Sequence, residues 1–316
     1  HAELILAFAE KEFARQPEHR QAGWDMAMAS QRLAQVLDGL GRPKEALVHA
    51  RNSFAHCMAL AQSEPDEKTA AGYRKEGHDN LPPALFAAGL LDEGDAATAA
   101  AVAWVSERMD QVPEADRASL QLALLLHRIR QGEARADGVS LAPLYREMRD
   151  VIQLRFASFD DPVMRDHYFT LWSDNEITAC LIVGDLAHAQ ALFAQWEPAA
   201  KAYLEANPSP PNQLAVARVA VCRAELATAE GRRDDAIAAC DEALGKVALI
   251  RQEAPDDAST IWLELEALCR RADLLGDPAL KAEASARWQA QKAACEGLLP
   301  PYTSQIMIDH LVSGWG

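Results

Sequence analysis

The sequence predicts an all-α protein, an α-solenoid of about six antiparallel helix hairpins. Apolar residues recur at intervals of three and four, which is the stripe of an amphipathic helix. Glycine and proline also alternate regularly, and the separation from glycine to proline is 24 residues in four of the six pairs. We expect each glycine to turn the chain inside a hairpin and each proline to break it between hairpins. The glycines are Gly41, Gly94, Gly132, Gly184, Gly231 and Gly276, and the prolines are Pro65, Pro113, Pro162, Pro208, Pro255 and Pro300.

The clearest hairpin runs from Asn212 to Pro255. Gly231 separates two amphipathic helices, and Asp234 and Asp235 are suited to the start of the second one. In the first helix the charged residues Arg218, Arg223, Glu225 and Glu230 lie largely outside the apolar stripe. Both stripes consist mostly of alanine, which allows the two backbones to approach closely. Such a hairpin cannot bury its apolar faces alone, so it must stack on neighbouring hairpins.

The same pattern divides the whole chain. We expect an N-terminal capping helix in residues 1–20, repeats near 21–65, 66–113, 114–162, 163–208, 209–255 and 256–299, and a C-terminal cap or tail in 300–316. In the second repeat, Pro82 and Pro83 predict a helix break at Asp79–Asn80. In the third, residues 132–140 are predicted to be an insertion between the two helices.

Composition limits the possible partners. The 316 residues carry a formal net charge of −16, without the basic surface that nucleic acids or anionic lipids require. The six cysteines include no C-x-x-C pair, so we interpret them as small core residues in a reducing compartment. The expected location is the cytoplasm, or the periplasm if a membrane span precedes His1. Because the chain begins with histidine, we expect it to be a piece of a longer protein.

The repeats resemble the tetratricopeptide repeat family. The residues that carry the resemblance are Leu33-Ala34, Gly41, Ala46 and Pro65 in the first repeat, Gly184, Ala189 and Pro208 in the fourth, and Ala224, Gly231, Ala236 and Pro255 in the fifth. The second helix is longer here than in the family by about two helical turns. Repeats of this long form are similar to those that follow the catalytic domains of some bacterial serine/threonine kinases and other signalling proteins.

The resemblance implies a right-handed superhelix whose concave face is lined by first helices and binds an extended peptide or a partner helix. Many family members hold a C-terminal carboxylate with Lys, Asn and Arg side chains of adjacent first helices. The positions that correspond to the Asn are Arg32, Leu85, Leu124, Asn175, Cys222 and Ala267. Only Asn175 matches, so we do not expect a two-carboxylate clamp.

No catalytic or cofactor signature is present. The sequence has no glycine loop for phosphate, no H-E-x-x-H and no G-x-S-x-G. Asp185 and His188 share one helical face after a turn and could hold a metal. A capping Asp beside a surface His is favoured, because no further motif completes a site. We therefore expect no enzyme activity, no cofactor and no metal.

Candidate binding residues concentrate in Asp160–Asn175. Polar and aromatic side chains gather there at the start of a first helix and suit a peptide-binding patch, although the same aromatic residues could fill the junction of the third and fourth repeats. Basic and aromatic residues on other first helices suit an acidic peptide or carboxylate, or else ion pairs within the chain. The candidates are His167, Tyr168, Trp172 and Asn175 in this stretch, and Tyr73, Arg74, His78, Arg128, Arg130 and Arg218 elsewhere.

The favoured function is a non-catalytic protein- or peptide-binding scaffold, the regulatory or sensor part of a larger bacterial signalling protein. One alternative is a self-association module that forms a homodimer through the long second helices. Another is a small-molecule sensor with a pocket between the third and fourth repeats. Neither nucleic acid binding nor membrane insertion is expected.

Overall fold

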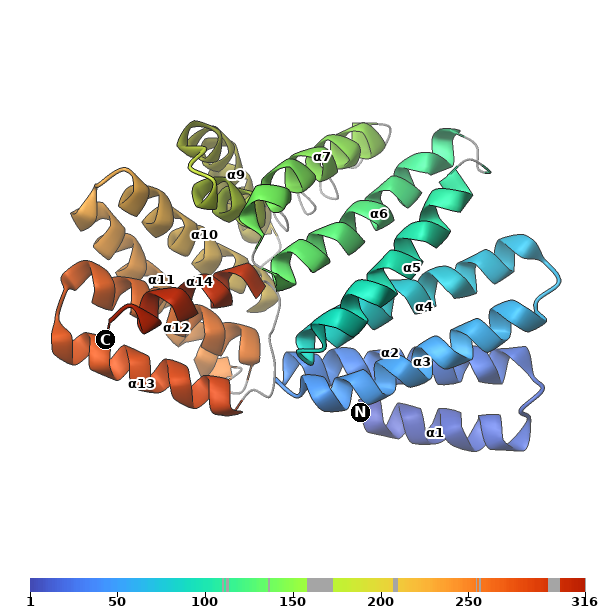
Figure 1. Ribbon diagram of the computed structural model, residues 1–316. Helices are drawn as coiled ribbons and strands as arrows, with labels where there is room; N and C mark the ends of the chain where they lie inside the picture. The colour runs from blue at the N-terminus through green and yellow to red at the C-terminus, as the bar shows by residue number, and fades with distance from the viewer. Residues whose placement is uncertain are drawn as a thin grey trace. The chain divides into compact units, whose positions relative to one another are not determined.

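A computed structural model describes residues 1–109, 111, 114–135, 137–157, 173–206, 210–253, 255, 257–294 and 302–315. These residues form helices and short turns, without any strand (Figure 1). The chain divides into an N-terminal unit, His1–Gln111, and a C-terminal unit built from the helices that follow. The all-α solenoid class is therefore confirmed: each unit is a stack of helices in which neighbours in sequence pack on one another.

The N-terminal unit holds one single helix and two hairpins. Helix α1 packs on α2, α2 on α3, α3 on α4, and α4 on α5. Small and aliphatic side chains at helical spacing form the core, among them Ala29, Leu33, Ala46 and Ala50. The helices are α1 (Ala2–Arg15), α2 (Arg20–Gly39), α3 (Pro43–Ser63), α4 (Glu67–Ala87) and α5 (Leu91–Met109).

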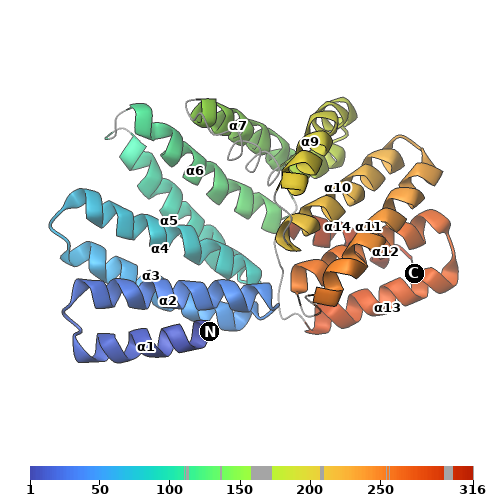
Figure 2. The ribbon, with the colours of Figure 1, turned by 180° about the vertical axis from the view of Figure 1, so that it is seen from behind.

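The C-terminal unit contains four hairpins and a final helix (Figures 1 and 2). The first helices of the four hairpins are, in chain order, α6 (Glu114–Ala134), the helix over residues 173–182, α10 (Pro210–Ala229) and α12 (Ala258–Leu275). The second helices are α7 (Gly138–Ala157), α9 (Leu186–Ala206), α11 (Arg233–Glu253) and α13 (Pro278–Ala294). The last helix is α14 (Tyr302–Ser313). We refer to the surface formed by the four first helices as the first-helix face.

Five turns between first and second helices use a glycine in the left-handed conformation. These glycines have φ between 68° and 78°, where a residue without Cβ is favoured. In the turn at Gly41, the amide of Gly41 donates to the carbonyl of Asp38 and the amide of Arg42 to that of Leu37, which is the Schellman pattern. The prediction holds for Gly41, Gly184, Gly231 and Gly276.

Two predicted turn glycines are wrong. The second repeat turns at Gly89, which lies 24 residues before Pro113, and Gly94 belongs to α5. Gly132 lies within α6, and the predicted insertion is mostly helical because α6 continues to Ala134 and α7 begins at Gly138. Both glycines are needed for close packing: an added Cβ would lie 2.4 Å from Phe86 at Gly94 and 2.9 Å from Leu141 at Gly132.

The predicted break at Asp79–Asn80 is also wrong, since α4 continues through Pro82 and Pro83. The Asn80 side chain donates to the carbonyl of Glu76 (2.6 Å) and accepts from Gln31 of α2 (2.8 Å). Leu85 and Phe86, beyond the prolines, are buried in the core. Tertiary packing on both sides of the prolines therefore outweighs the lost backbone hydrogen bonds.

The cysteines behave as core residues. Cys57, Cys180, Cys222, Cys240 and Cys269 are free thiols and buried, and burial raises the pKa of Cys57 to about 11. Cys295 lies outside the described residues. Among the described helices, none is long and apolar enough to span a bilayer.

Candidate functional site

The C-terminal unit carries a row of polar and charged side chains along its first-helix face. Thr178, Glu225 and Arg270 each lie six residues before the turn glycine of their own hairpin. Equal register on successive first helices brings these side chains next to one another. Together with residues one turn away, they form what we call the charged row: Asp174, Thr178, Arg218, Glu225, Glu266 and Arg270.

Arg218 joins three first helices. Its Nε lies 3.1 Å from Asp174 Oδ2 in the helix over residues 173–182. Its Nη1 lies 2.5 Å from Glu266 Oε2 on α12. The guanidinium matches two carboxylates at once because its donors point in fixed directions. One side chain of α10 therefore ties the fourth repeat to the sixth.

Arg270 closes the second half of the row. Its Nη2 pairs with Glu225 Oε1 on α10 and lies 3.2 Å from Glu266 Oε1, one turn back on its own helix. The Thr178 hydroxyl donates to Glu225 Oε2 at 3.2 Å. Glu225, which the sequence placed largely outside the apolar stripe, is buried. It is held inside by partners from the two neighbouring first helices.

Burial separates the pKa values of the three carboxyl groups. Burial raises the pKa of Asp174 and of Glu225 above the ordinary range, although the nearby arginines partly oppose it. Glu266 is equally buried, but Arg218 and Arg270 outweigh desolvation and hold its pKa below the ordinary value. Glu266 is therefore the carboxylate that most firmly keeps its negative charge.

The charged row retains unused hydrogen-bonding capacity. Asp174 Oδ1 and Arg270 Nε are buried and have no hydrogen-bond partner among the described residues. A buried polar atom without a partner costs free energy, so each such atom favours the arrival of a complementary group. One acceptor and one donor on the same face match the amide and carbonyl of a peptide backbone.

A second buried polar group closes the hairpin of α6 and α7. The Tyr145 hydroxyl donates to Glu133 Oε1, and Arg130 Nη1 donates to Glu133 Oε2 at 2.9 Å. Burial, the charge of Glu133 and the negative charge of Asp174 all raise the pKa of Tyr145. Arg130, predicted to contact a ligand, therefore pairs within its own repeat.

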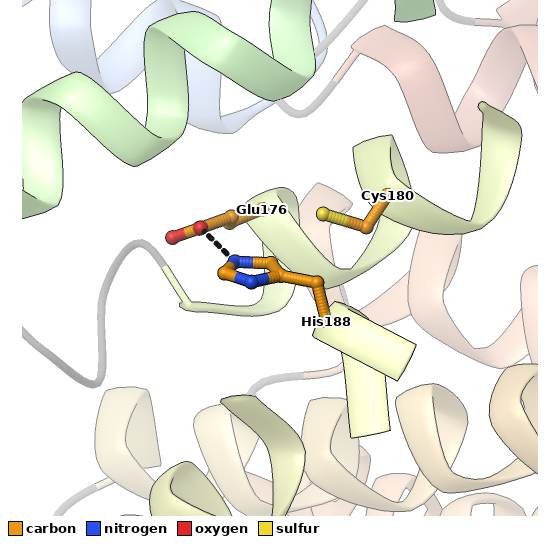
Figure 3. A group of neighbouring side chains, drawn as sticks. All are labelled: Glu176, Cys180 and His188. Carbon is orange, nitrogen blue, oxygen red and sulfur yellow. Dashed lines mark hydrogen bonds and ion pairs between the residues drawn. The ribbon is translucent and has the colours of Figure 1, made fainter. Parts of the chain in front are cut away.

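Figure 3 shows a third cluster, Glu176, Cys180 and His188, in the fourth repeat. Glu176 and Cys180 lie one turn apart on the helix over residues 173–182, and both point toward His188 at the start of α9. His188 Nε2 lies 2.8 Å from Glu176 Oε1. Asp185 caps α9, since its Oδ1 accepts from the His188 amide at 3.2 Å.

The three ligand atoms lie within 4.8 Å of one another, which is close enough to consider a metal. The surrounding charges oppose it. Arg149 Nη1 lies 3.3 Å from the same Glu176 oxygen, and Arg146 lies beside Cys180 and pairs with Asp185. Burial, more than the nearby carboxylates, raises the pKa of Cys180 to about 11, so the thiol keeps its proton at neutral pH. The cluster fits an ion-paired link across the hairpin better than a cation site.

The predicted residues of the N-terminal unit mostly contact their own unit. The Tyr73 ring lies 5.3 Å from that of Trp24 between centroids, and His78 stacks on Trp104 at 5.6 Å. Arg74 Nη1 lies 3.2 Å from Glu67 Oε1. All three side chains are partly buried. Aromatic packing accounts for the positions of Tyr73 and His78, and ion pairing accounts for that of Arg74.

In the C-terminal unit, Arg128 is exposed on α6 and Asn175 is partly buried next to Asp174. The charged row thus includes Arg218 and adjoins Asn175. His167, Tyr168 and Trp172, with the predicted pocket between the third and fourth repeats, lie outside the described residues. The turn at Gly89 also moves the family's Asn position in the second repeat from Leu85 to Asn80, whose amide is engaged by Gln31.

Sequence reasoning missed most of the charged row. Thr178, Glu225, Glu266 and Arg270 were not selected, because each is a common residue on a helix that has other charges. Their shared distance from the turn glycine was the available signal. That signal becomes useful only when the turn glycines are correctly identified.

Helix α14 lies on the same side of the unit. It packs on α12 and also contacts α6, the first helices of the last and first hairpins of this unit. Figure 1 shows it running across α12 with its N-terminal end beside the C-terminal end of α6, and the view from behind in Figure 2 agrees. The sequence predicts a cap on the last hairpin here, and α14 does contact the first helix of that hairpin, α12; the contact with α6 was not foreseen.

Comparison with known proteins gives only a distant likeness. No protein-family model matches the chain, and no curated protein matches it. Among solved structures, the chain is similar to one described as "The hypoxic regulator of sterol synthesis Nro1 is a nuclear import adaptor". The match covers 100% of this chain and 98% of that one, with 11% identity and a TM-score of 0.33.

Proposed function

We propose that this protein is a non-catalytic binding scaffold that holds a segment of another protein on the first-helix face of its C-terminal unit. The observation that carries the proposal is the charged row. A stack that needed only stability would gain as much from apolar side chains at these positions, since buried ion pairs are often no better than hydrophobic replacements. Ion pairs that link three successive first helices, with an unpaired acceptor on Asp174 and an unpaired donor on Arg270, suit recognition of a peptide backbone.

The test is a peptide selection. A displayed library of random 16-residue peptides is selected against the full chain, and the affinities of the recovered peptides are measured for Arg128→Ala and Asn175→Ala. Both residues lie on first helices, and Arg128 is exposed. We expect affinity to fall at least tenfold in each variant while the circular dichroism spectrum stays the same.

Lys201→Ala is the matched control. It removes one positive charge from the second helix α9, where Lys201 makes an exposed ion pair with Glu197. Its affinity for the peptides should remain within twofold of the wild type. Failure to recover any peptide, or equal effects of all three substitutions, would contradict binding at the first-helix face.

The resemblance to long tetratricopeptide repeats supports a finer version of the proposal. In that version the array is a regulatory part of a bacterial signalling protein, acts in the cytoplasm and contacts an attached catalytic domain. It is supported by the motif at Gly184, Ala189 and Pro208 and by its counterparts in other repeats. The neighbouring coding sequence of the full-length gene tests it directly, and an unrelated or missing catalytic domain would contradict it.

Self-association is a second candidate, and α1 favours it. Leu4 and Phe8, one turn apart on this helix, are 71% and 68% exposed, and Ile5 between them is 46% exposed. On the long second helices the large exposed apolar residues, such as Val48 and Leu249, stand singly, as is normal for a surface. If chains associate, we expect them to do so through α1 rather than through second helices.

Light scattering over a concentration series tests this candidate. A dimer should dissociate on the double substitution Leu4→Lys, Phe8→Lys and persist on Val48→Lys, which changes an exposed valine of α3. A monomer at every concentration would eliminate self-association.

A further inference from the structure

The first-helix face of the C-terminal unit is already occupied by a helix of the same chain. Four first helices form this face, and α14 touches both α12 and α6. Because α12 and α6 are both first helices, α14 lies against the first-helix face. Figures 1 and 2 show α14 in this position from opposite sides.

The described contacts of α14 are chemically specific. Ile308 and Val312, one turn apart, are its well-buried described side chains, at 1% and 6% exposure. Asp309 Oδ1 accepts from the Trp288 indole nitrogen (3.0 Å), and Asp309 Oδ2 lies 2.7 Å from Lys292 Nζ. Burial alone would raise the pKa of Asp309, but Lys292 and Trp288 outweigh it and lower this pKa. The carboxylate therefore stays charged at neutral pH.

The site that holds Asp309 is basic and aromatic, and it belongs to the second helix α13 of the last hairpin. Trp288 packs edge-on against Trp262, with ring centroids 4.8 Å apart, which fixes the indole that donates to Asp309. Lys292 stands one turn beyond Trp288 on α13, so both donors face the same carboxylate. In a chain with a net charge of −16, this is a local site for an acidic group.

Its size suggests that α14 can leave the face. It has 12 residues, whereas the hairpin helices labelled in Figure 1 have 17 to 21 residues. An isolated helix of about 12 residues is only marginally stable in water, so its helical state depends on docking. Its attachment to the same chain gives it a high effective concentration at the face, which a partner in solution must overcome.

We propose that α14 is a built-in competitor on the partner-binding face, and that the partner is an amphipathic helix of the same chemistry. The partner would present two aliphatic side chains one turn apart and a carboxylate directly after the first of them, and would displace α14. This inference rests on the proposed function, because it names the partner class and the regulation of the same face. Binding is then limited by release of α14.

The test uses a labelled synthetic peptide of residues 302–316 as the probe and fluorescence anisotropy with the full chain. The double substitution Ile308→Asp, Val312→Asp in the chain should release its own α14, and the probe should then bind at least tenfold more tightly than to the wild type. His310→Asp is the matched control, since His310 is exposed on α14. It should leave probe binding at the wild-type level.

A charge exchange tests the carboxylate. A probe carrying Asp309→Lys should lose at least tenfold in affinity for the double variant. It should regain affinity when that variant also carries Lys292→Glu, because the ion pair is then restored with opposite signs. If circular dichroism shows that the double variant is unfolded, the single variant Asp309→Lys in the chain replaces it, and the probe should again bind more tightly than to the wild type.

The inference is overturned if a folded release variant binds the probe no better than the wild type does, or if the Asp309→Lys probe binds as well as the native one. Library peptides that bind the first-helix face equally in wild type and release variant would leave the proposed function standing and remove the competitor role of α14. Probe binding without any library peptide would make α14 an intramolecular cap, and would contradict both the proposed function and the competitor role that rests on it.

Discussion

Arg218 brings a positive charge into the interior of the C-terminal unit, where two carboxylates from different helices hold it. Each partner is also largely buried, so none of the three can be solvated if another is removed. The three charged groups therefore depend on one another. Together they compensate each other's charge, while removal of any one side chain leaves a buried charge without its partner. The same holds for Glu225 with Arg270.

Arg218→Met should therefore destabilise the protein strongly. The free energy of unfolding, measured by urea denaturation, is expected to fall by about 3–5 kcal/mol, the usual cost of breaking a buried pair. Arg15→Met, which breaks the exposed pair with Glu12, should cost less than about 1 kcal/mol. Similar costs for the two variants would show that Arg218 is solvated in the native protein.

Asp174 predicts a specific pH dependence. Burial raises its pKa in the folded state above the unfolded value, so its contribution to stability is complete below the unfolded pKa and is lost as pH rises through the folded pKa. The stability of the wild type relative to Asp174→Asn should therefore decrease between about pH 4, near the ordinary pKa of Asp, and pH 7. Denaturation curves at several pH values measure it, and a difference that grows with pH would contradict the raised pKa.

At the scale of the element, each helix follows from apolar spacing, while glycine has two separate uses. Gly89 ends α4 with φ of 78° and has open space around its missing Cβ. Gly94, five residues later, has helical neighbours on both sides and is packed against Phe86. Sequence alone does not separate a glycine needed for backbone conformation from one needed for contact.

These two uses predict different responses to substitution. Gly89→Ala should destabilise by about 1–2 kcal/mol, the cost of a left-handed L-residue, and Gly89→Asn should recover part of it. Gly94→Ala should cost about 1–3 kcal/mol through overpacking. A second substitution, Phe86→Leu, should recover part of this loss, whereas Gly94→Asn should not be better tolerated than Gly94→Ala. Thermal unfolding of the five variants tests the assignment, which fails if Asn is the better substitute at Gly94.

At the scale of the whole molecule, each helix packs chiefly on its neighbours in sequence, as in other repeat stacks. The N-terminal and C-terminal units each contain their own buried clusters, which include Leu33 and Ala46 in one and Trp196 and Ile177 in the other. Stability in such a stack is a sum over repeats and their interfaces. A substitution that destabilises one repeat should therefore affect mainly that repeat and its neighbours.

Trp196→Ala tests this expectation. Trp196 is fully buried in α9 and packs against the fourth and fifth repeats, so its removal should cost about 3–5 kcal/mol locally. Hydrogen exchange is expected to accelerate in residues 173–182, α9 and α10, and to remain unchanged in α2 and α3. Uniform acceleration over the whole chain would show that the protein unfolds as one cooperative body.

The sequence by itself determined that this protein is a stack of paired helices, because the spacing of apolar residues and of four turn glycines is local information. It also selected Arg218 and Asn175, which stand next to or within the charged row. The tertiary structure decided what neighbours contribute: the continuity of α4 through Pro82 and Pro83, the contact role of Gly94, and the pairing of Arg218 with residues 44 and 48 positions away. It also placed α14 against α12 and α6, two of the first helices. The physical reason is that a periodic pattern fixes which side of a helix is buried, whereas the partner of a buried charge depends on which helix the stack brings beside it.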